Sequence, residues 1–111
     1  MQNPNPGLSL ILFPPPDNEP VLLADTPDAE AVRRAVTEQK WGEITFLLLK
    51  ADEENWLEVS GSLEDGFSAR YREHGKEWIA NAPPAFPQET MQLLVSYLKR
   101  DDRWRTMVGW D

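Results

Sequence analysis

From Glu43 onwards the apolar residues recur at every second position, and this period of two constrains the fold more than any other sequence feature. A spacing of two places alternate side chains on opposite faces of an extended chain, which is typical of β-strands. Segments with this pattern lie at 43–50, 56–61, 67–73 and 76–81, and short loops separate them. Because short loops join neighbouring antiparallel strands, the sequence predicts a four-stranded meander here.

The lengths of the loops predict the register of the meander. If residues 74–75 form a two-residue turn, Arg72 lies opposite Glu77. The length of the preceding loop likewise places Glu58 opposite Arg70. Both pairs join opposite charges across neighbouring strands, which stabilises the pairing. The same register collects apolar residues on the other face, namely Leu57, Val59, Phe67, Ala69, Tyr71, Trp78 and Ala80.

The first strand of the meander departs from simple alternation because it is apolar on both faces. Leu47 and Leu49 belong on the core face, which leaves Ile44, Phe46 and Leu48 on the opposite side. A strand that is apolar on both faces usually lies inside a sheet that is covered on both sides. We therefore expect either the N-terminal strands or a binding partner to cover the second face.

Helices and further strands are expected on both sides of the meander. Thr26 followed by Pro27 is typical of a helix N-terminus, and this helix is expected to end near Gly42. A second helix is predicted over residues 87–99. The apolar stripes are Ala29, Val32, Ala35 and Val36 in the first helix and Met91, Leu94, Val95 and Leu98 in the second. Short apolar runs predict terminal strands at 8–13, 21–24 and 104–110.

These elements predict a single domain over residues 1–111, because a chain of this length is too short for two independent cores. Its class is α+β, with two helices packed on a mainly antiparallel sheet. In that sheet the central four-strand meander is extended by the terminal strands.

The chain is acidic, with 11 Lys and Arg against 19 Asp and Glu and a net charge of −8. Such a charge repels nucleic acids and anionic membranes, so we expect neither as a partner. The absence of cysteine excludes disulfides and thiolate metal sites. No basic residue precedes Arg33, as the positive region of a secretory signal requires, and no apolar run approaches the length of a membrane span. We therefore expect a cytoplasmic protein.

Residues for catalysis or metal binding are few. His74 is the single histidine and lies beside Gly75 in an expected hairpin turn, so we interpret it as a turn residue rather than a base. Residues 52–55 lack the alternating ligands and the glycine of a calcium loop. A hydrolase that uses paired carboxylates would need one pKa raised by burial, whereas most acids here lie in expected loops. The sequence predicts no metal and no cofactor.

Two groups of residues are candidates for binding a protein partner. Phe46, Leu48 and Trp56 fall on the second face of the sheet, where they either anchor a partner or pack against the N-terminal strands. Loop acids that would attract a basic partner are Asp52, Glu53, Glu54, Glu64 and Asp65. Successive turns of a meander lie at opposite ends of the sheet, so these acids are not expected to form a single patch.

Three consecutive segments are predicted to form a helix, a sheet and a second helix. They are TPDAEAVRRAVTEQ, ITFLLLKADEENWLEVSGSLEDGFSARYREHG and ETMQLLVSYLKRDDRWRTMVGW. These segments resemble the small immunity proteins of bacterial polymorphic-toxin systems, and the resemblance covers residues 21–110. It depends on Trp56, Gly66, Phe67, Tyr71, Tyr97, Leu98, Trp104 and Trp110. The start of the chain at residues 8–16 departs from what is expected of that family.

The resemblance implies a non-enzymatic inhibitor that binds a co-produced toxin, often a nuclease or nucleic-acid deaminase, and blocks its active site. The family has no shared catalytic motif, so no catalytic residue is carried over. The alternative is a structural or adaptor domain that self-associates through the face that carries Phe46, Leu48 and Trp56. A monomer and a homodimer both remain open.

Overall fold

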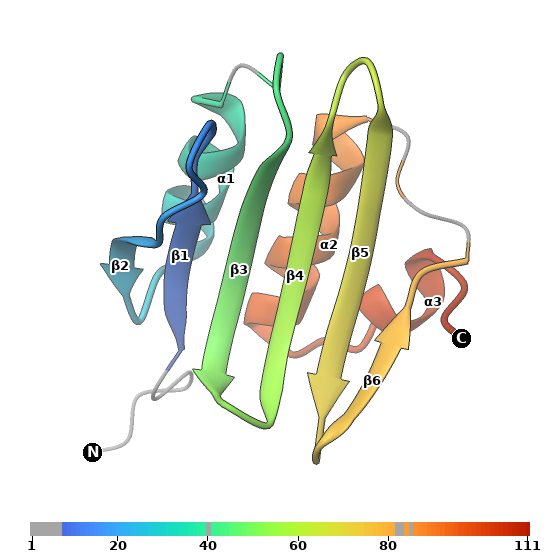
Figure 1. The fold of residues 1–111 in the computed structure, drawn as a ribbon. Coiled ribbons are helices and arrows are strands. Elements are labelled where there is room, and N and C mark those ends of the chain that lie inside the picture. Colours follow the sequence, from blue (N-terminus) through green and yellow to red (C-terminus); the bar gives the residue numbers. More distant parts are fainter. Residues whose placement is uncertain (1–7, 40, 82–83, 85) are drawn as a thin grey trace.

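All neighbouring strands of the sheet run antiparallel, in the order β2-β1-β3-β4-β5-β6 (Figure 1). The computed structural model describes residues 8–39, 41–81, 84 and 86–111. The strands are β1 (Ser9–Phe13), β2 (Val21–Asp25), β3 (Thr45–Asp52), β4 (Asn55–Ser62), β5 (Gly66–Glu73) and β6 (Lys76–Ile79). The helices are α1 (Ala29–Thr37), α2 (Pro87–Lys99) and α3 (Trp104–Met107). They lie on one side of the sheet (Figure 1), so the predicted α+β class is confirmed.

The predicted register of the meander is confirmed. Arg72 pairs with Glu77 across β5 and β6, and Glu58 pairs with Arg70 across β4 and β5. The turn between β5 and β6 contains His74 at φ 52° followed by a glycine at φ 83°. Two successive positive φ angles are typical of the tight hairpin turn whose twist matches that of the strands. The turn therefore holds the predicted pairs in register.

The N-terminal strands extend the sheet sideways and do not cover its second face. β1 pairs with β3, and β2 pairs with β1 to form one edge. In this arrangement Phe13 lies beside Phe46, and Ile11 lies beside Leu48. The backbone of β3 needs hydrogen-bond partners on both edges, and β1 supplies them on the side away from β4. Phe46 and Leu48 thus have residues of the N-terminal strands as neighbours within the sheet, but of the two expected covers for the second face, β1 and β2 do not provide one.

The hydrophobic core lies between the sheet and the helices. It is formed by Leu8, Leu10, Val32, Ala35, Val36, Trp41, Leu47, Leu49, Leu57, Val59, Phe67, Ala69, Tyr71, Ala80, Leu93, Leu94, Leu98 and Trp104. The predicted stripe of α1 is buried, apart from the partly buried Ala29. In α2 the buried stripe is rotated from the prediction, because Thr90 and Leu93 are fully buried whereas Met91 and Val95 are only partly so. Met91 instead lines a hollow beside Val36 of α1.

Helix α1 begins two residues later than the predicted N-terminus. Asp28, not Thr26, is the N-cap, and its carboxylate accepts a hydrogen bond from the backbone N–H of Ala31 at 2.8 Å. Thr26 has a left-handed φ of 44°, and its N–H donates to the carbonyl of Leu8. The helix ends at Thr37, before the predicted Gly42. A carboxylate one turn before the apolar stripe therefore caps this helix in place of the threonine hydroxyl.

The predicted strand over residues 104–110 is wrong, because its first half forms α3. The Ser96 hydroxyl accepts a hydrogen bond from the N–H of Trp104 at 2.8 Å, and Asp101 accepts one from the N–H of Arg103 at 3.1 Å. These bonds satisfy free N–H groups at the start of a helical turn. Only the last residues pair with the sheet, where Trp110 bridges Ala80.

Aromatic side chains attach the C-terminal segment to the sheet. Tyr71 of β5 stacks on Trp78 with 4.8 Å between ring centroids. Trp104 and Trp110 each make an edge-to-face contact with the same tyrosine, with 4.7 Å between ring centroids. Stacked and edge-to-face contacts of this kind stabilise beyond the burial of their area. This cluster fixes the position of α3 against β5.

Gly61, the glycine of β4, should tolerate substitution poorly. Its φ is 139°, and a Cβ atom would lie 2.2 Å from the carbonyl oxygen of Gly66. We expect Gly61→Ala to lower the free energy of unfolding by about 2 kcal/mol or more, because the backbone must shift. Gly42→Ala is the control, since no atom lies within 4 Å of the added carbon. Urea unfolding measures both, and equal midpoints would contradict the prediction.

Candidate functional site

The sheet face opposite the helices carries no helix or strand of the described chain (Figure 1). We call it the open face. Its side chains are Ser9, Ile11, Phe13, Leu22, Phe46, Leu48, Lys50, Trp56, Glu58, Ser60, Ser68, Arg70, Arg72, Glu77 and Ile79. The strand register places these residues in rows that cross the sheet, and the two halves of each row differ in chemistry.

On β2, β1 and β3 the open face is apolar in two rows, which we call its apolar half, and the neighbouring row carries Asp25, Ser9 and Lys50. Leu22, Ile11 and Leu48 are neighbours in one row, and Phe13 and Phe46 are neighbours in the next. Leu22 is 56% exposed, and the other four side chains are half-buried. Neighbouring apolar side chains on an uncovered face mark a binding surface in soluble proteins. Two of the predicted anchor residues, Phe46 and Leu48, therefore lie within a continuous apolar surface.

The half of the open face on β4, β5 and β6 is ionic. Arg70 lies 2.8 Å from Glu58 and 3.7 Å from Glu77, and Arg72 lies 3.2 Å from both Glu77 and Glu54. The side chains are partly exposed, so each pair contributes less than about 1 kcal/mol to stability. Because positive and negative side chains alternate, this half is nearly neutral, and the ion pairs fix the positions of its side chains.

Trp56 lies at the boundary between the two halves and apart from Phe46. Its cross-strand neighbours are Lys50 and Arg72, and the guanidinium of Arg70 lies 5.3 Å from its ring centroid. The cationic group over the ring contributes a cation–π interaction. Of the three predicted anchors, Phe46 and Leu48 lie in the apolar half, and Trp56 lies on the next strand, diagonal to Leu48.

A hollow of about 330 Å³ lies over β4, β5 and β6, beside Phe46 of the apolar half. Its lining residues are Phe46, Glu58, Ser60, Ser68, Ala69, Arg70 and Ile79. The small side chains of Ser60 and Ser68 are paired across β4 and β5, between Phe46 on one side and Arg70 on the other. The open face is therefore not flat, and its hollow has an aromatic wall and an ionic wall.

The predicted acidic residues lie at the two ends of the sheet, as expected from the meander. In the turn between β3 and β4, the Asp52 carboxylate accepts the backbone N–H of Glu54 at 2.7 Å. This hydrogen bond holds the pKa of Asp52 below its usual range. Glu53 pairs with Lys50 at 2.8 Å, and Glu54 pairs with Arg72. This turn is therefore partly neutralised by neighbouring cations.

The turn between β4 and β5 carries the other predicted acids. Asp65 hydrogen-bonds the hydroxyl of Ser62 at 3.1 Å, and Glu64 is exposed. The register places this turn at the Phe46 end of the open face and the Asp52 turn at its Trp56 end. One acidic turn therefore lies at each end of the open face.

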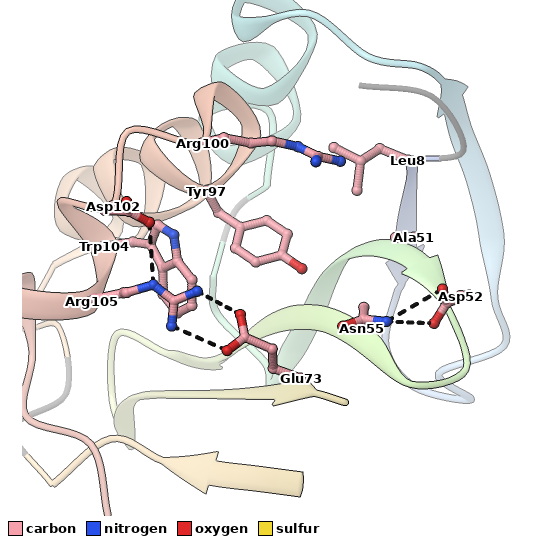
Figure 2. Close-up of a pocket in the computed structure, with 10 residues that line it drawn as sticks. All are labelled: Leu8, Ala51, Asp52, Asn55, Glu73, Tyr97, Arg100, Asp102, Trp104 and Arg105. Carbon is pink, nitrogen blue, oxygen red and sulfur yellow. Dashed lines mark hydrogen bonds and ion pairs between the residues drawn. The ribbon is translucent and has the colours of Figure 1, made fainter. Parts of the chain in front are cut away.

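A second concave feature lies on the helix side of the molecule, at the end of the sheet that carries the Asp52 turn. It is a cavity of about 480 Å³. Figure 2 shows its lining residues, which are Leu8, Ala51, Asp52, Asn55, Glu73, Tyr97, Arg100, Asp102, Trp104 and Arg105. Three separate parts of the chain meet here, namely the start of β1, the ends of β3 to β5, and the α2–α3 corner.

Arg105 holds one wall of this cavity in place. Its Nη2 lies 2.5 Å from Oε2 of Glu73, and its Nε lies 3.2 Å from Oδ1 of Asp102 (Figure 2). The guanidinium also lies 4.4 Å from the ring centroid of Trp104. The hydrogen bond with Glu73 is the main cause of the raised pKa of Arg105. This arginine is therefore fully engaged with the protein itself.

Tyr97 and Arg100 line the cavity from α2 and its C-terminal end, and the ring of Tyr97 contacts that of Trp104 (Figure 2). The hydroxyl of Tyr97 points into the cavity (Figure 2), and burial raises its pKa to about 12. The charge of Arg100 partly opposes this shift, whereas the charge of Glu73 adds to it. Arg100 follows the end of α2 with a left-handed φ of 57°, and its side chain is exposed. The tyrosine is therefore a neutral hydrogen-bonding group at physiological pH.

The pKa values of Asp52 and Asp101 are both lowered, opposite to what a general acid needs. His74 is exposed in its turn, where its backbone N–H donates to Asn55. Among residues 8–39, 41–81, 84 and 86–111, no group of three or more His, Asp or Glu is arranged to hold a metal ion. None of the described helices is long and apolar enough to cross a membrane.

Two parts of these sites were not predicted from the sequence, namely the N-terminal residues of the open face and the cavity beside α2. Ile11, Phe13 and Leu22 were expected in strands but not on the surface that carries Phe46. Their alternation with core residues was a usable signal, but it does not say which strand lies beside β3. In the cavity, Glu73 pairs with Arg105, which lies 32 positions later in the sequence, and no local sequence pattern predicts such a contact.

The chain matches no protein-family model, and comparisons with curated proteins and with solved structures found no significant match. The sites above are therefore interpreted from their own chemistry.

Asp101 should make the stability of the protein depend on acid pH. Hydrogen bonds from the Ser96 hydroxyl and from Arg103 lower the pKa of Asp101 to about 2, from an ordinary value of 3.8. Because the native pKa is lower, the stabilising contribution is complete above pH 3.8 and is lost as the pH falls towards 2. We expect the free energy of unfolding of Asp101→Asn, measured by urea titration at each pH, to fall less over this interval than that of the wild type. Glu64→Gln controls for the change of net charge. The same decrease in the free energy of unfolding with acid pH for the wild type and Asp101→Asn would contradict the prediction.

Proposed function

We propose that this chain is a non-enzymatic, immunity-type protein that binds a basic toxin through the open face and occludes its active site. The observation that supports it best is an uncovered sheet face with a continuous apolar half on a chain of net charge −8. Apolar contacts supply the affinity of such an interface, and long-range charge supplies the rate of encounter.

The size of the open face suggests that the acidic turns take part in binding. Six strands about 4.8 Å apart and about six residues long span roughly 500–600 Å². A stable interface buries about 800 Å² on each partner. The turns that carry Glu53 and Glu64 lie at the two ends of the face and would supply the remaining area. A partner that covers the face would thus meet apolar contacts at the centre and negative charge at both ends.

The hollow beside Phe46 offers a place for one projecting side chain of the toxin. The methylene groups of a long basic side chain would contact Phe46, and its charge would compete with Arg70 for Glu58, which lies 2.8 Å from Arg70. A toxin that acts on nucleic acid carries such side chains to bind phosphate groups. Occupation of these groups by the acidic protein would exclude the substrate.

Self-association through the same face is the alternative. It would bring together two copies that each carry a charge of −8, and the repulsion opposes the contact at low salt. A basic partner gains from the same charge. Sedimentation of the protein alone distinguishes the two functions, because self-association predicts a concentration-dependent dimer that Trp56→Ala breaks.

Truncation of the apolar anchors should weaken toxin binding without unfolding the protein. We expect Phe46→Ala and Leu48→Ala each to cost about 2 kcal/mol, or roughly thirtyfold in Kd, because each removes part of the desolvated centre. Met107→Ala on the helix side is the matched control, since this methionine is 39% exposed. The partner is captured from a native-cell lysate with the wild-type chain, purified, and assayed for growth inhibition with and without it.

Two outcomes contradict the proposed function. One is a captured partner that is not toxic, or whose toxicity the wild-type chain does not neutralise. The other is a toxic partner whose affinity is equal for wild type, Phe46→Ala and Leu48→Ala.

Reversal of the charge on the two acidic turns should slow association with the same toxin. We expect the double variant Glu53→Lys and Glu64→Lys to lower the association rate about tenfold and to flatten its salt dependence, because the attraction acts at long range. The double variant Glu30→Lys and Glu38→Lys makes the same change of charge on exposed positions of the helix side. Stopped-flow measurements at low and high salt test this, and equal rates for both double variants would rule out steering by the turns.

A further inference from the structure

The cavity beside α2 presents two hydrogen-bond donors that the described chain leaves without acceptors. No carboxylate of residues 8–39, 41–81, 84 and 86–111 lies within ion-pairing distance of Arg100. Within the same residues the Tyr97 hydroxyl forms no hydrogen bond, and it points into the cavity (Figure 2). Both groups favour an anion, and the guanidinium favours a planar carboxylate or a phosphate.

The remaining charges of the cavity oppose a simple anion. Asp52, Glu73 and Asp102 line it together with the two arginines. Arg105 is paired with Glu73 and Asp102, which leaves Asp52 as the carboxylate without an arginine partner. Three carboxylates thus face two arginines, and the cavity carries a net charge of −1. The charged groups without an ion-pair partner among the described residues are Arg100 and Asp52, and the Asp52 carboxylate accepts hydrogen bonds from the Asn55 amide at 3.0 Å and from the Glu54 N–H. An anionic ligand alone would be repelled by Asp52, and a cationic ligand alone by Arg100.

The geometry points to a site for a small zwitterion of the amino-acid type. Its carboxylate would bind the Arg100 guanidinium and the Tyr97 hydroxyl, and its ammonium group would face Asp52 and the Glu73 side of the cavity. The rings of Tyr97 and Trp104, with Leu8 and Ala51, provide an apolar wall for a side chain. A volume of about 480 Å³ lies within the range of small-molecule sites. This site is separate from the open face, and it does not depend on the proposed function.

Titration of the full chain with free amino acids tests the site directly. Each proteinogenic amino acid is added at millimolar concentration to ¹⁵N-labelled protein, and amide and indole signals are followed by NMR. We expect at least one to cause saturable shifts at Arg100, Asp52 and the Trp104 indole. Its amide, which lacks the carboxylate, and its N-acetyl form, which lacks the ammonium group, should each bind about tenfold more weakly or worse, because each loses one charged contact.

Variants of single side chains separate the two ends of the ligand. Arg100→Gln and Tyr97→Phe should weaken binding of the free amino acid about tenfold, and Asp52→Asn should do the same while keeping an oxygen for the turn. Lys99→Gln is the matched control, because Lys99 neighbours Arg100 in sequence but lines a different hollow. Tyr97→Phe retains the ring, whose centroid lies 5.1 Å from that of Trp104. Weaker binding by this variant is therefore due to loss of the hydroxyl.

Three results would overturn the proposal. They are the absence of saturable shifts with every amino acid, binding of the N-acetyl form or of inorganic phosphate as tight as that of the free amino acid, and equal effects of Lys99→Gln and Arg100→Gln. None of them bears on Phe46 or Leu48, so failure here is distinguishable from failure of toxin binding.

Discussion

The antiparallel register of β3, β4 and β5 determines which side chains enter the core and which face solvent. Because side chains alternate along a strand, a slip by one residue would move Leu47 and Leu57 into water and Glu58 into the core. The left-handed turn at His74 and the close approach at Gly61 both oppose such a slip. The core, the ionic pairs and the apolar surface are thus consequences of one pairing.

The asymmetry of the sheet follows from this register. Both main helices and the aromatic contacts of Tyr71 lie on one side, where Leu49 and Val59 are fully buried. The other side remains uncovered by the described chain. It carries Phe46 next to Phe13, and both side chains are half-buried. The open face and the cavity beside α2 lie on opposite sides of the sheet and meet at the turn between β3 and β4, whose Asp52 and Asn55 line the cavity.

Local patterns predicted the class and the meander, because turn lengths and cross-strand charges act between near neighbours. Arg72 and Glu77 are five residues apart, and their pairing could be read directly from the sequence. The position of β1 beside β3 was not predictable in this way, since strand order depends on contacts between distant segments. The error at α3 has a different cause, because the side chain of Ser96 caps a helical turn where spaced tryptophans indicate a strand.

The candidate sites were predictable only in part. Phe46 and Leu48 were identified from the excess of apolar residues in their strand, and the opposite positions of the two acidic turns followed from the meander. Trp56 was placed with them because it shares their face, but a face contains many rows, and Trp56 lies beside Lys50. Arg100 and Tyr97 carry no pattern that distinguishes them from ordinary helix residues, since their importance arises only where α2 ends beside β3 and β5.

The two edges of the sheet differ in what they offer to another strand. At β6 the outward N–H and C=O of Ile79 are already bonded to the backbone of Asp111, whereas no described residue pairs with the outer edge of β2. An uncovered edge is where a strand of another molecule can add to a sheet. Asp111 therefore shortens the part of the β6 edge that is open to such pairing, whereas the apolar and exposed β2 presents its whole outer edge.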